Sequence, residues 1–287
     1  MFKRLVLPLI AALAMTLPAA AQPPVWVVRD QDSTIVLFGS VHLLPPGLDW
    51  RPQALNTAIQ SADDIWFELP LDPADSQAAS QIAATRGVLP EGERLSDRLS
   101  PAGRRRLARI AKSENLSMDG LERMRPWLAE VTLGVAQLAK GGANGSDGVE
   151  RTLDQAAPAS AQRRAFETPE QQIAFFADAP EKEQVASLED TLRQMEQDPD
   201  EYSKLLKAWM VGDVKALERQ GLKPMRRASP VLYERLVTGR NARWAEAIAG
   251  RLAGSGETVV VVGAAHLIGR DGVPAMLRRR GITVEGP

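Results

Sequence analysis

Two apolar runs at opposite ends of the chain each end in Gly-x-x-His. The segment TIVLFGSVH ends at His42, and the segment TVVVVGAAH ends at His266. Runs of β-branched and apolar residues of this length predict buried strands. These two histidines are the only ones in the chain of 287 residues. If both serve one site, the fold must join the two ends of the chain in one sheet.

The rest of the pattern supports such a sheet. Val25–Arg29 and Thr34–Phe38 flank a polar turn and predict a β-hairpin, and a helical segment and a short strand ending at Glu68 come next. Strand, helix and strand in this order predict parallel pairing. The C-terminal segments ETVVVVGAAH, GVPAMLRRRG and ITVEG repeat the order. Between them, residues 74–252 show helical spacing, with a short strand expected near Arg164–Phe166.

We therefore expect the α/β fold class. Its mixed, largely parallel sheet would be built from βαβ units at both chain ends, with a large helical middle region over about 74–252. We see no linker long enough to separate domains, so residues 22–287 are expected to form a single domain.

The first residues are typical of a secretory signal peptide. Lys3 and Arg4 precede the apolar stretch Leu5–Leu17, and small residues lead to a cleavage site after Ala21. A retained membrane anchor is the alternative. Export predicts a periplasmic or secreted protein, and the absence of cysteine rules out disulfides and cysteine ligands. A net charge of −1 gives no indication of a nucleic-acid partner, and no membrane contact is expected beyond the signal peptide.

The ends of the predicted strands carry the residues suited to chemistry. Ligands of open α/β sheets bind at the carboxyl ends of strands. There, Gly39 and Gly263 would let the backbone approach a ligand or cofactor closely, and Ser40 would line it. His42 and His266 would project into the same crevice as metal ligands or acid–base groups. For a lone motif, an ordinary structural histidine is the better interpretation, but two such motifs favour a shared site.

Glu68 closes the third strand and completes a candidate set with His42 and His266. Two imidazoles and a carboxylate could hold a divalent metal, with Mn, Co or Zn as candidates. They could equally activate a water molecule without a metal. An ordinary glutamate facing water is the alternative for Glu68.

Two further segments offer weaker candidates. In TGRNARW, Arg240 and Asn241 could orient a substrate or stabilise a developing negative charge. The alternative is a surface arginine on a helix that buries Trp244. Glu167, in FETPEQQ, is better interpreted as a charge near a helix N-terminus. Phosphate-binding loops, Gly-x-Ser-x-Gly elbows and His-Glu-x-x-His helices do not occur in the sequence.

The order of several segments resembles the TraB/GumN family, which is similar to the Tiki proteases. The matching segments are LFGSVH, IWFELP, DGVERTLDQAA with RRAFETPEQQ, GRNARWAEAI and VVVVGAAHLIGRDGVPAMLRRRG. The resemblance implies that His42, Glu68 and His266 form the functional site. It further implies metal-dependent peptidase chemistry, although the wider clan includes erythromycin esterases and a haem-binding lipoprotein. Ser40 stands where the family usually has threonine, and both residues carry a hydroxyl.

Taken together, these observations predict an exported hydrolase that cleaves peptide bonds with a divalent metal. One alternative is a protein that binds haem, a metal or a small ligand without turning it over. Another is a metal-independent esterase. A peptide or small molecule is the expected partner in each case.

Overall fold

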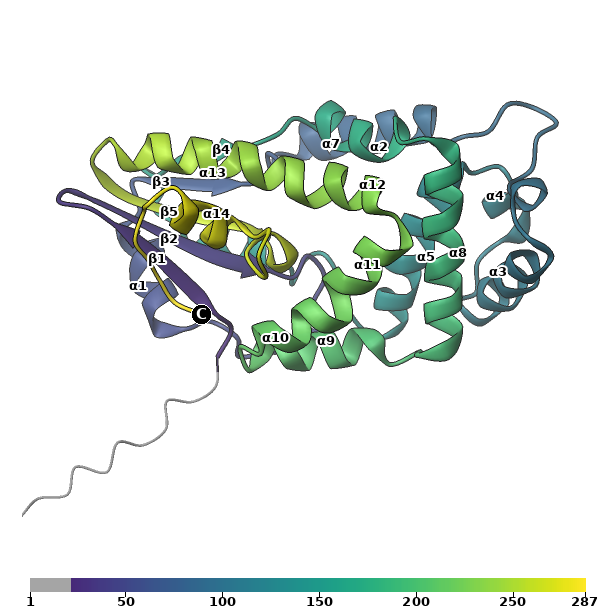
Figure 1. Cartoon of the computed structure of the whole chain (residues 1–287), viewed down its shortest axis with the longest axis horizontal. Coiled ribbons are helices and arrows are strands. Elements are labelled where there is room, and N and C mark those ends of the chain that lie inside the picture. Colours follow the sequence, from purple (N-terminus) through teal and green to yellow (C-terminus); the bar gives the residue numbers. More distant parts are fainter. Residues whose placement is uncertain (1–21) are drawn as a thin grey trace, which may run out of the picture.

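The computed structural model describes residues 22–287, and the predicted signal peptide lies outside the described residues. Within that range, six strands form one sheet (Figure 1). They are β1 (Val25–Arg29), β2 (Ser33–Ser40), β3 (Asp64–Phe67), β4 (Gln162–Ala165), β5 (Gly256–Gly263) and β6 (Val284–Glu285). The predicted α/β class is confirmed, and strands form at each segment where the sequence predicted one.

The strand order β4-β3-β5-β2-β1-β6 joins the two ends of the chain. The valine-rich strand β5 lies between β2 and β3 and pairs parallel with both. In this register Ser40 is the partner of Gly263, so the two Gly-x-x-His motifs lie side by side. Strand β1 is antiparallel to β2 and β6, whereas β4 is parallel to β3. The sheet is therefore mixed and largely parallel, as predicted.

Helices make up most of the remaining chain. They are α1 (Gln53–Ser61), α2 (Pro73–Arg86), α3 (Pro101–Ser113), α4 (Met118–Glu122), α5 (Pro126–Lys140), α6 (Val149–Ala156), α7 (Pro169–Ala177), α8 (Glu181–Gln197), α9 (Glu201–Met210), α10 (Val214–Leu217), α11 (Lys223–Ala228), α12 (Pro230–Tyr233), α13 (Gly239–Leu252) and α14 (Val273–Arg279). Short 3-10 turns occur at Leu95–Arg98 (η1) and Ala264–His266 (η4). The side chains of Ser100, Thr168 and Ser229 cap α3, α7 and α12, as the serine–proline and threonine–proline pairs predict.

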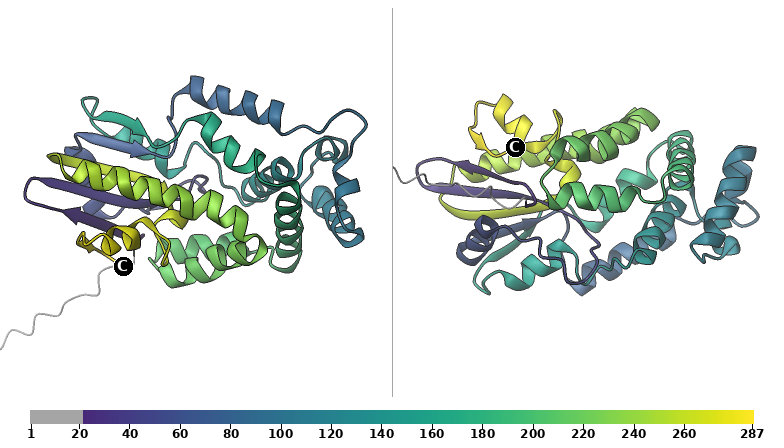
Figure 2. Two further views of the ribbon diagram at one scale, coloured as in Figure 1. Left: turned by 45° about the horizontal axis from the view of Figure 1, so that its top comes forward. Right: turned by 90° about the horizontal axis from the view of Figure 1, so that it is seen from below.

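The helices cover both faces of the sheet and extend beyond its carboxyl edge. Helices α1 and α6 lie on one face, and α13 and α14 lie on the other (Figure 2). One apolar core joins the sheet to these helices, and a second core fills the space among α3, α5 and α8. Within residues 22–287, no helix is long and apolar enough to span a membrane.

Two π-helical turns interrupt the last helical stretch before β5. They cover Glu218–Leu222 (η2) and Glu234–Thr238 (η3), and the second runs directly into α13. A π turn adds a residue to the helix and rotates the next turn about the helix axis, and such turns are common at functional sites. Here η3 ends two residues before Arg240, whose side chain reaches back to the carbonyl of Leu236. No sequence pattern indicated these turns.

Candidate functional site

Three of the predicted site residues follow the carboxyl ends of neighbouring strands, and two lie on a helix. Their positions are His42 after β2, Glu68 after β3 and His266 in the 3-10 turn after β5, with Arg240 and Asn241 on α13. The structure brings these residues together. Glu68, Arg240, Asn241 and His266 are buried, whereas 60% of the His42 side chain is exposed.

His42 is held by a carboxylate that sequence reasoning did not single out. Its Nδ1 lies 2.6 Å from Oε1 of Glu150, and the Ser40 hydroxyl donates to the same oxygen over 2.5 Å. This places the other ring nitrogen, Nε2, toward the cleft. The charge of Glu150 raises the pKa of His42 to about 9. Burial raises the pKa of Glu150, but the charge of His42 and the two hydrogen bonds outweigh burial and lower it.

Gly148 allows helix α6 to bring Glu150 to this position. A Cβ added at Gly148 would lie 2.2 Å from the carbonyl oxygen of His42, so only glycine permits this approach. The backbone N–H of Val149 donates to the carbonyl of Val41 over 3.3 Å and fixes the helix start against the loop.

Gly263 marks the point where three side chains converge. A Cβ added there would lie 3.1 Å from Oε1 of Glu68 and 3.5 Å from Nε2 of His42. The same Cβ would lie 3.7 Å from Cδ2 of His266. The backbone N–H of Gly263 also donates to Oε1 of Glu68 over 2.6 Å. Glycine therefore keeps a small space between the side chains of His42 and Glu68.

Arg240 is the centre of the buried part of the site. It donates to both oxygens of Glu167 over 2.7 and 2.8 Å, and to Oε2 of Glu68 over 2.6 Å. Its remaining N–H groups reach the carbonyl of Leu236 over 3.2 Å and Nε2 of His266 over 3.1 Å. A guanidinium has five N–H donors, so all of them are used within the protein. Arg240 positions its neighbours and has no donor left for a substrate.

The hydrogen bonds of His266 define its tautomer. The amide nitrogen of Asn241 donates to the carbonyl of Asp271, so its amide oxygen faces His266. That oxygen lies 2.6 Å from Nδ1 of His266, which therefore carries the proton. The Nε2 lone pair accepts from Arg240. Burial, supported by the charge of Arg240, lowers the pKa of His266 to about 4, so the ring is neutral at pH 7.

Aromatic rings enclose this buried group. The guanidinium of Arg240 lies 4.7 Å from the Trp244 ring centre and 5.4 Å from that of Phe175. The His266 ring lies 4.5 Å from Trp244.

Burial raises the pKa of Glu68, but His266, Arg240, His42 and the Gly263 N–H outweigh burial and lower it to about 2. Burial raises the pKa of Glu167, and the hydrogen bonds and charge of Arg240 oppose that effect.

The side chains expected to hold a divalent metal are already engaged in this arrangement. Nε2 of His266 and Oε2 of Glu68 both accept from Arg240, whose positive charge would repel a cation at the same place. Within residues 22–287, no group of three or more His, Asp or Glu side chains is arranged to hold a metal ion. The donor set does not fit a metal in this geometry, and metal binding stays a prediction.

Comparison with known proteins identifies the family. The model of the TraB/PrgY/gumN family matches residues 24–286. The chain belongs to the TraB/PrgY/gumN family. It is 26% identical over 243 residues to the protein YbaP of Escherichia coli (strain K12), and equally to YbaP of Shigella flexneri. The alignments cover 84% of this chain and 87% of each relative. No solved structure matches the chain. The family resemblance inferred from the motifs is confirmed, while the similarity to Tiki proteases stays a prediction.

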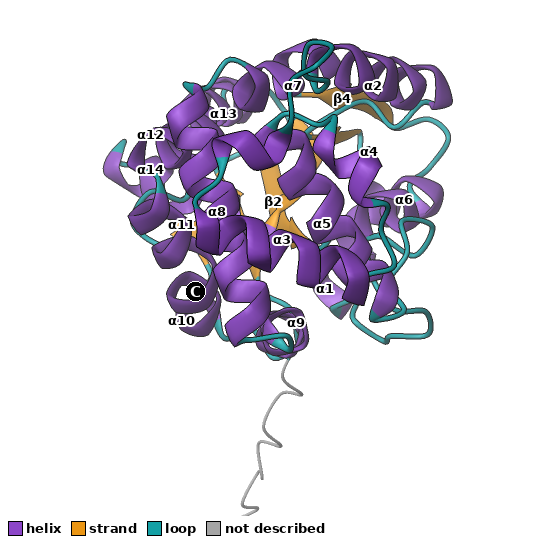
Figure 3. Ribbon diagram, turned by 90° about the vertical axis from the view of Figure 1, so that its right-hand side faces the viewer, coloured by secondary structure: helices purple, strands orange, loops and turns teal. Residues whose placement is uncertain are grey.

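Two hollows in this TraB/PrgY/gumN protein meet at the strand ends. The smaller, about 260 Å³, is lined by Glu68, Glu150 and Gln172 around His42. The larger, about 680 Å³, also reaches His42, Glu68 and His266 and extends among α5, α7 and α9. Seen from the helical end, α3, α5 and α8 stand in front of the sheet around β2, and α9 lies below them (Figure 3). The helical middle therefore forms the walls of the cleft.

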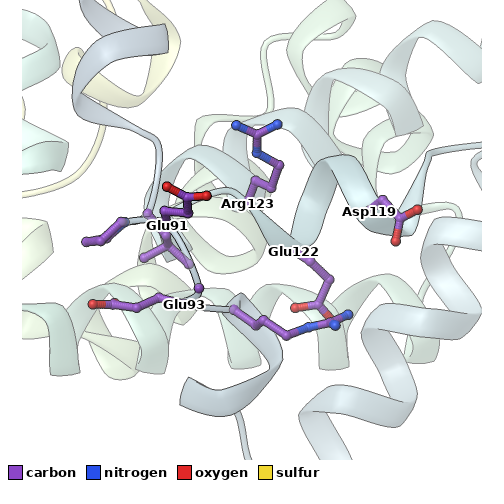
Figure 4. A pocket seen from close by; sticks show the side chains of 9 residues that line it. Glu91, Glu93, Asp119, Glu122 and Arg123 are labelled. Carbon is purple, nitrogen blue, oxygen red and sulfur yellow. The ribbon is translucent and has the colours of Figure 1, made fainter.

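A third hollow lies far from these residues and plays no part in the site. It measures about 760 Å³ and is lined by residues 89–94 with Asp119, Glu122 and Arg123 (Figure 4). The Glu122 carboxylate is already engaged, because it accepts the N–H of Ser96 over 3.0 Å and lies 3.6 Å from Arg94. None of the predicted site residues of this TraB/PrgY/gumN member lines it.

Sequence reasoning missed one carboxylate of the site, Glu150, and favoured the wrong interpretation of another, Glu167. Glu167 follows β4 and pairs with Arg240, so its interpretation as a charge near a helix N-terminus was incomplete. Its position after a short strand was the available signal. Glu150 lies within the family segment DGVERTLDQAA and bonds His42 across 108 positions of the chain. No spacing rule connects the two, because the sheet and α6 must assemble first.

Proposed function

We propose that this protein is a hydrolase that cleaves an ester or amide through proton transfer by His42. The observation that carries the proposal is the orientation of the His42 ring. Glu150 holds Nδ1, whereas Nε2 opens onto the space beside Gly263 and faces Glu68. A histidine oriented by a carboxylate, with its second nitrogen free, is the arrangement that acid–base catalysis requires.

In this reaction His42, Glu68 and Arg240 would have different roles. A water molecule between Nε2 of His42 and Oε1 of Glu68 would attack the carbonyl carbon of the substrate, and His42 would take its proton. When the carbon–oxygen or carbon–nitrogen bond breaks, His42 would return that proton to the leaving group. Glu68, with a pKa of about 2, is too weak a base for this step and would orient the water. Arg240 would hold Glu68 in place.

The pH dependence of the rate tests the role of His42. Only the neutral ring can accept a proton, and Glu150 raises the pKa of His42 to about 9. The ratio kcat/KM for p-nitrophenyl acetate should therefore rise with pH through about 9 and level off above that value. The variant His42→Ala should lose this rise and most of the activity. A wild-type rate that is equal at pH 6 and pH 9 after subtraction of the uncatalysed reaction would contradict the proposal.

Metal-dependent peptide-bond hydrolysis, the reaction the family resemblance implies, is the competing version. The engagement of Glu68 and His266 by Arg240 favours the metal-free version. Purified protein should be assayed on p-nitrophenyl acetate and on a peptide panel, after exhaustive chelation and after addition of Mn, Co or Zn. Activity that survives chelation supports the metal-free proposal. Activity that appears only with a metal supports the competing version.

Ligand binding without turnover, the other alternative, predicts a different experimental result. Nε2 of His42 is exposed to the cleft and could ligate a haem iron. Haem binding would produce a Soret band that disappears in His42→Ala.

The proposed export is tested by N-terminal sequencing of the purified protein, because a chain cleaved after Ala21 begins at Gln22.

A further inference from the structure

The larger hollow extends well beyond the side chains proposed to transfer protons. It reaches His42, Glu68 and Gly263 at one end and continues among helices α5, α7 and α9. Its volume, about 680 Å³, lies within the range of sites for small organic ligands, which is about 300–1,000 Å³. The cleft is therefore large enough to hold a substantial part of a substrate beyond the reacting bond.

The walls of this hollow are apolar. Trp127 of α5 stacks on Phe176 of α7 with ring centres 6.0 Å apart, and Leu205 and Leu206 of α9 also line the hollow. Val131 of α5 also lines the hollow, and 40% of its surface is exposed. Apolar surface of this kind is unfavourable in water and favours a ligand that covers it.

Polar groups are confined to a few positions of the lining. Gln172 borders both hollows near His42 and Glu68. The hydroxyl of Tyr202 donates to the carbonyl of Leu43 over 2.7 Å. The wall helices satisfy their own backbone N–H and C=O groups internally. A peptide main chain lying along these walls would leave its amides without partners, which costs free energy. A hydrocarbon chain carries no such groups.

We infer that the cleft receives the acyl chain of the substrate, with the scissile carbonyl at His42. This inference rests on the proposed function and specifies its substrate class: an ester or amide of a medium-length or long fatty acid. The apolar walls would bind the chain, and the carbonyl would lie at the polar end between His42 and Glu68.

Rates and binding test the inference separately. We expect kcat/KM for p-nitrophenyl octanoate to exceed that for the acetate by about tenfold or more, since each methylene buried in an apolar pocket improves the rate. Val131→Asp, which introduces a charge into the wall, should lower the octanoate-to-acetate ratio by about tenfold. Val231→Asp is the matched control, because Val231 of α12 is 42% exposed and does not line the hollow. It should keep the wild-type ratio.

Binding of dansyl-undecanoic acid to the wild-type protein provides a readout that needs neither turnover nor a folded variant. Displacement of the probe by lauric acid supports the inference, even if no ester is hydrolysed and the proposed function fails. Hydrolysis of acetate with no gain for octanoate and no binding of the probe would overturn the inference and leave the proposed function standing. Stronger displacement by a blocked peptide of leucine and valine would overturn it in favour of a peptide substrate.

Discussion

Arg240 donates to Nε2 of His266 over 3.1 Å, so the lone pair of the second motif histidine faces a permanent cation. The two histidines, equivalent in sequence, therefore differ in chemistry. His42 is exposed with a raised pKa, whereas His266 is buried with a lowered pKa. Only His42 has a nitrogen available to a substrate, and His266 belongs to the structure that holds Arg240.

Replacing Arg240 with lysine should destabilise the protein by about 3 kcal/mol, because lysine cannot make the five hydrogen bonds and leaves two buried carboxylates poorly paired. The matched control is Arg243→Lys on the same helix, where the arginine is exposed and contacts the Phe175 ring. That change should alter the free energy of unfolding by less than about 0.5 kcal/mol. Urea denaturation measures both. Equal effects of the two substitutions would show that the network around Arg240 contributes nothing special.

The low pKa of His266 should make the protein sensitive to acid. The folded state holds the ring neutral down to about pH 4, whereas the unfolded chain takes up a proton near 6.5. Stability is therefore fully present above 6.5 and is lost as the pH falls toward 4, by on the order of 3 kcal/mol. His266→Gln should flatten this part of the profile, whatever its overall stability. A wild-type protein equally stable at pH 6.5 and pH 4.5 would contradict a buried neutral ring.

The raised pKa of His42 affects the stability of the protein at alkaline pH. The folded state retains a proton on the ring up to about pH 9, whereas the unfolded chain loses it near 6.5. This contribution is fully present below 6.5 and is lost as the pH rises through 9. Thermal melts between these values should show a decline in wild type that is smaller in His42→Gln. Because the ring is 60% exposed, solvent screening will keep the difference modest.

Much of this site could be predicted because strand ends are a local property. Apolar runs followed by glycine located β2 and β5, and the run ending at Glu68 located β3. Parallel pairing then brought His42, Glu68 and His266 to one edge of the sheet. In the observed register Ser40 is the partner of Gly263, which places the two motifs at the same level of the sheet.

The electrostatic roles could not be predicted, because they depend on partners supplied by distant segments. Glu150 reaches His42 only after the start of α6 packs against the loop that follows β2, and Glu167 reaches Arg240 only after β4 joins the sheet. Arg240 itself resembled a substrate clamp in sequence, since an arginine beside a cleft has donors to offer. Only the count of its hydrogen bonds shows that none remains. The sequence therefore predicted that Arg240 belongs to the site. Whether its N–H groups are free to bind a substrate depends on packing that the sequence does not show.

Gly263 offers the sharpest test of the space between His42 and Glu68. In Gly263→Ala the new methyl group would lie 3.1 Å from Oε1 of Glu68 and 3.5 Å from Nε2 of His42, where the attacking water is proposed to bind. Hydrolysis should fall by at least about a hundredfold, with an unfolding free energy within about 2 kcal/mol of wild type. The control is Gly250→Ala within α13, where an added Cβ meets no atom within 4 Å. That change should stabilise the protein by about 0.5–1 kcal/mol and leave the rate unaltered, since alanine favours a helix more than glycine does. If Gly263→Ala is folded and as active as Gly250→Ala, the reacting water does not lie between His42 and Glu68.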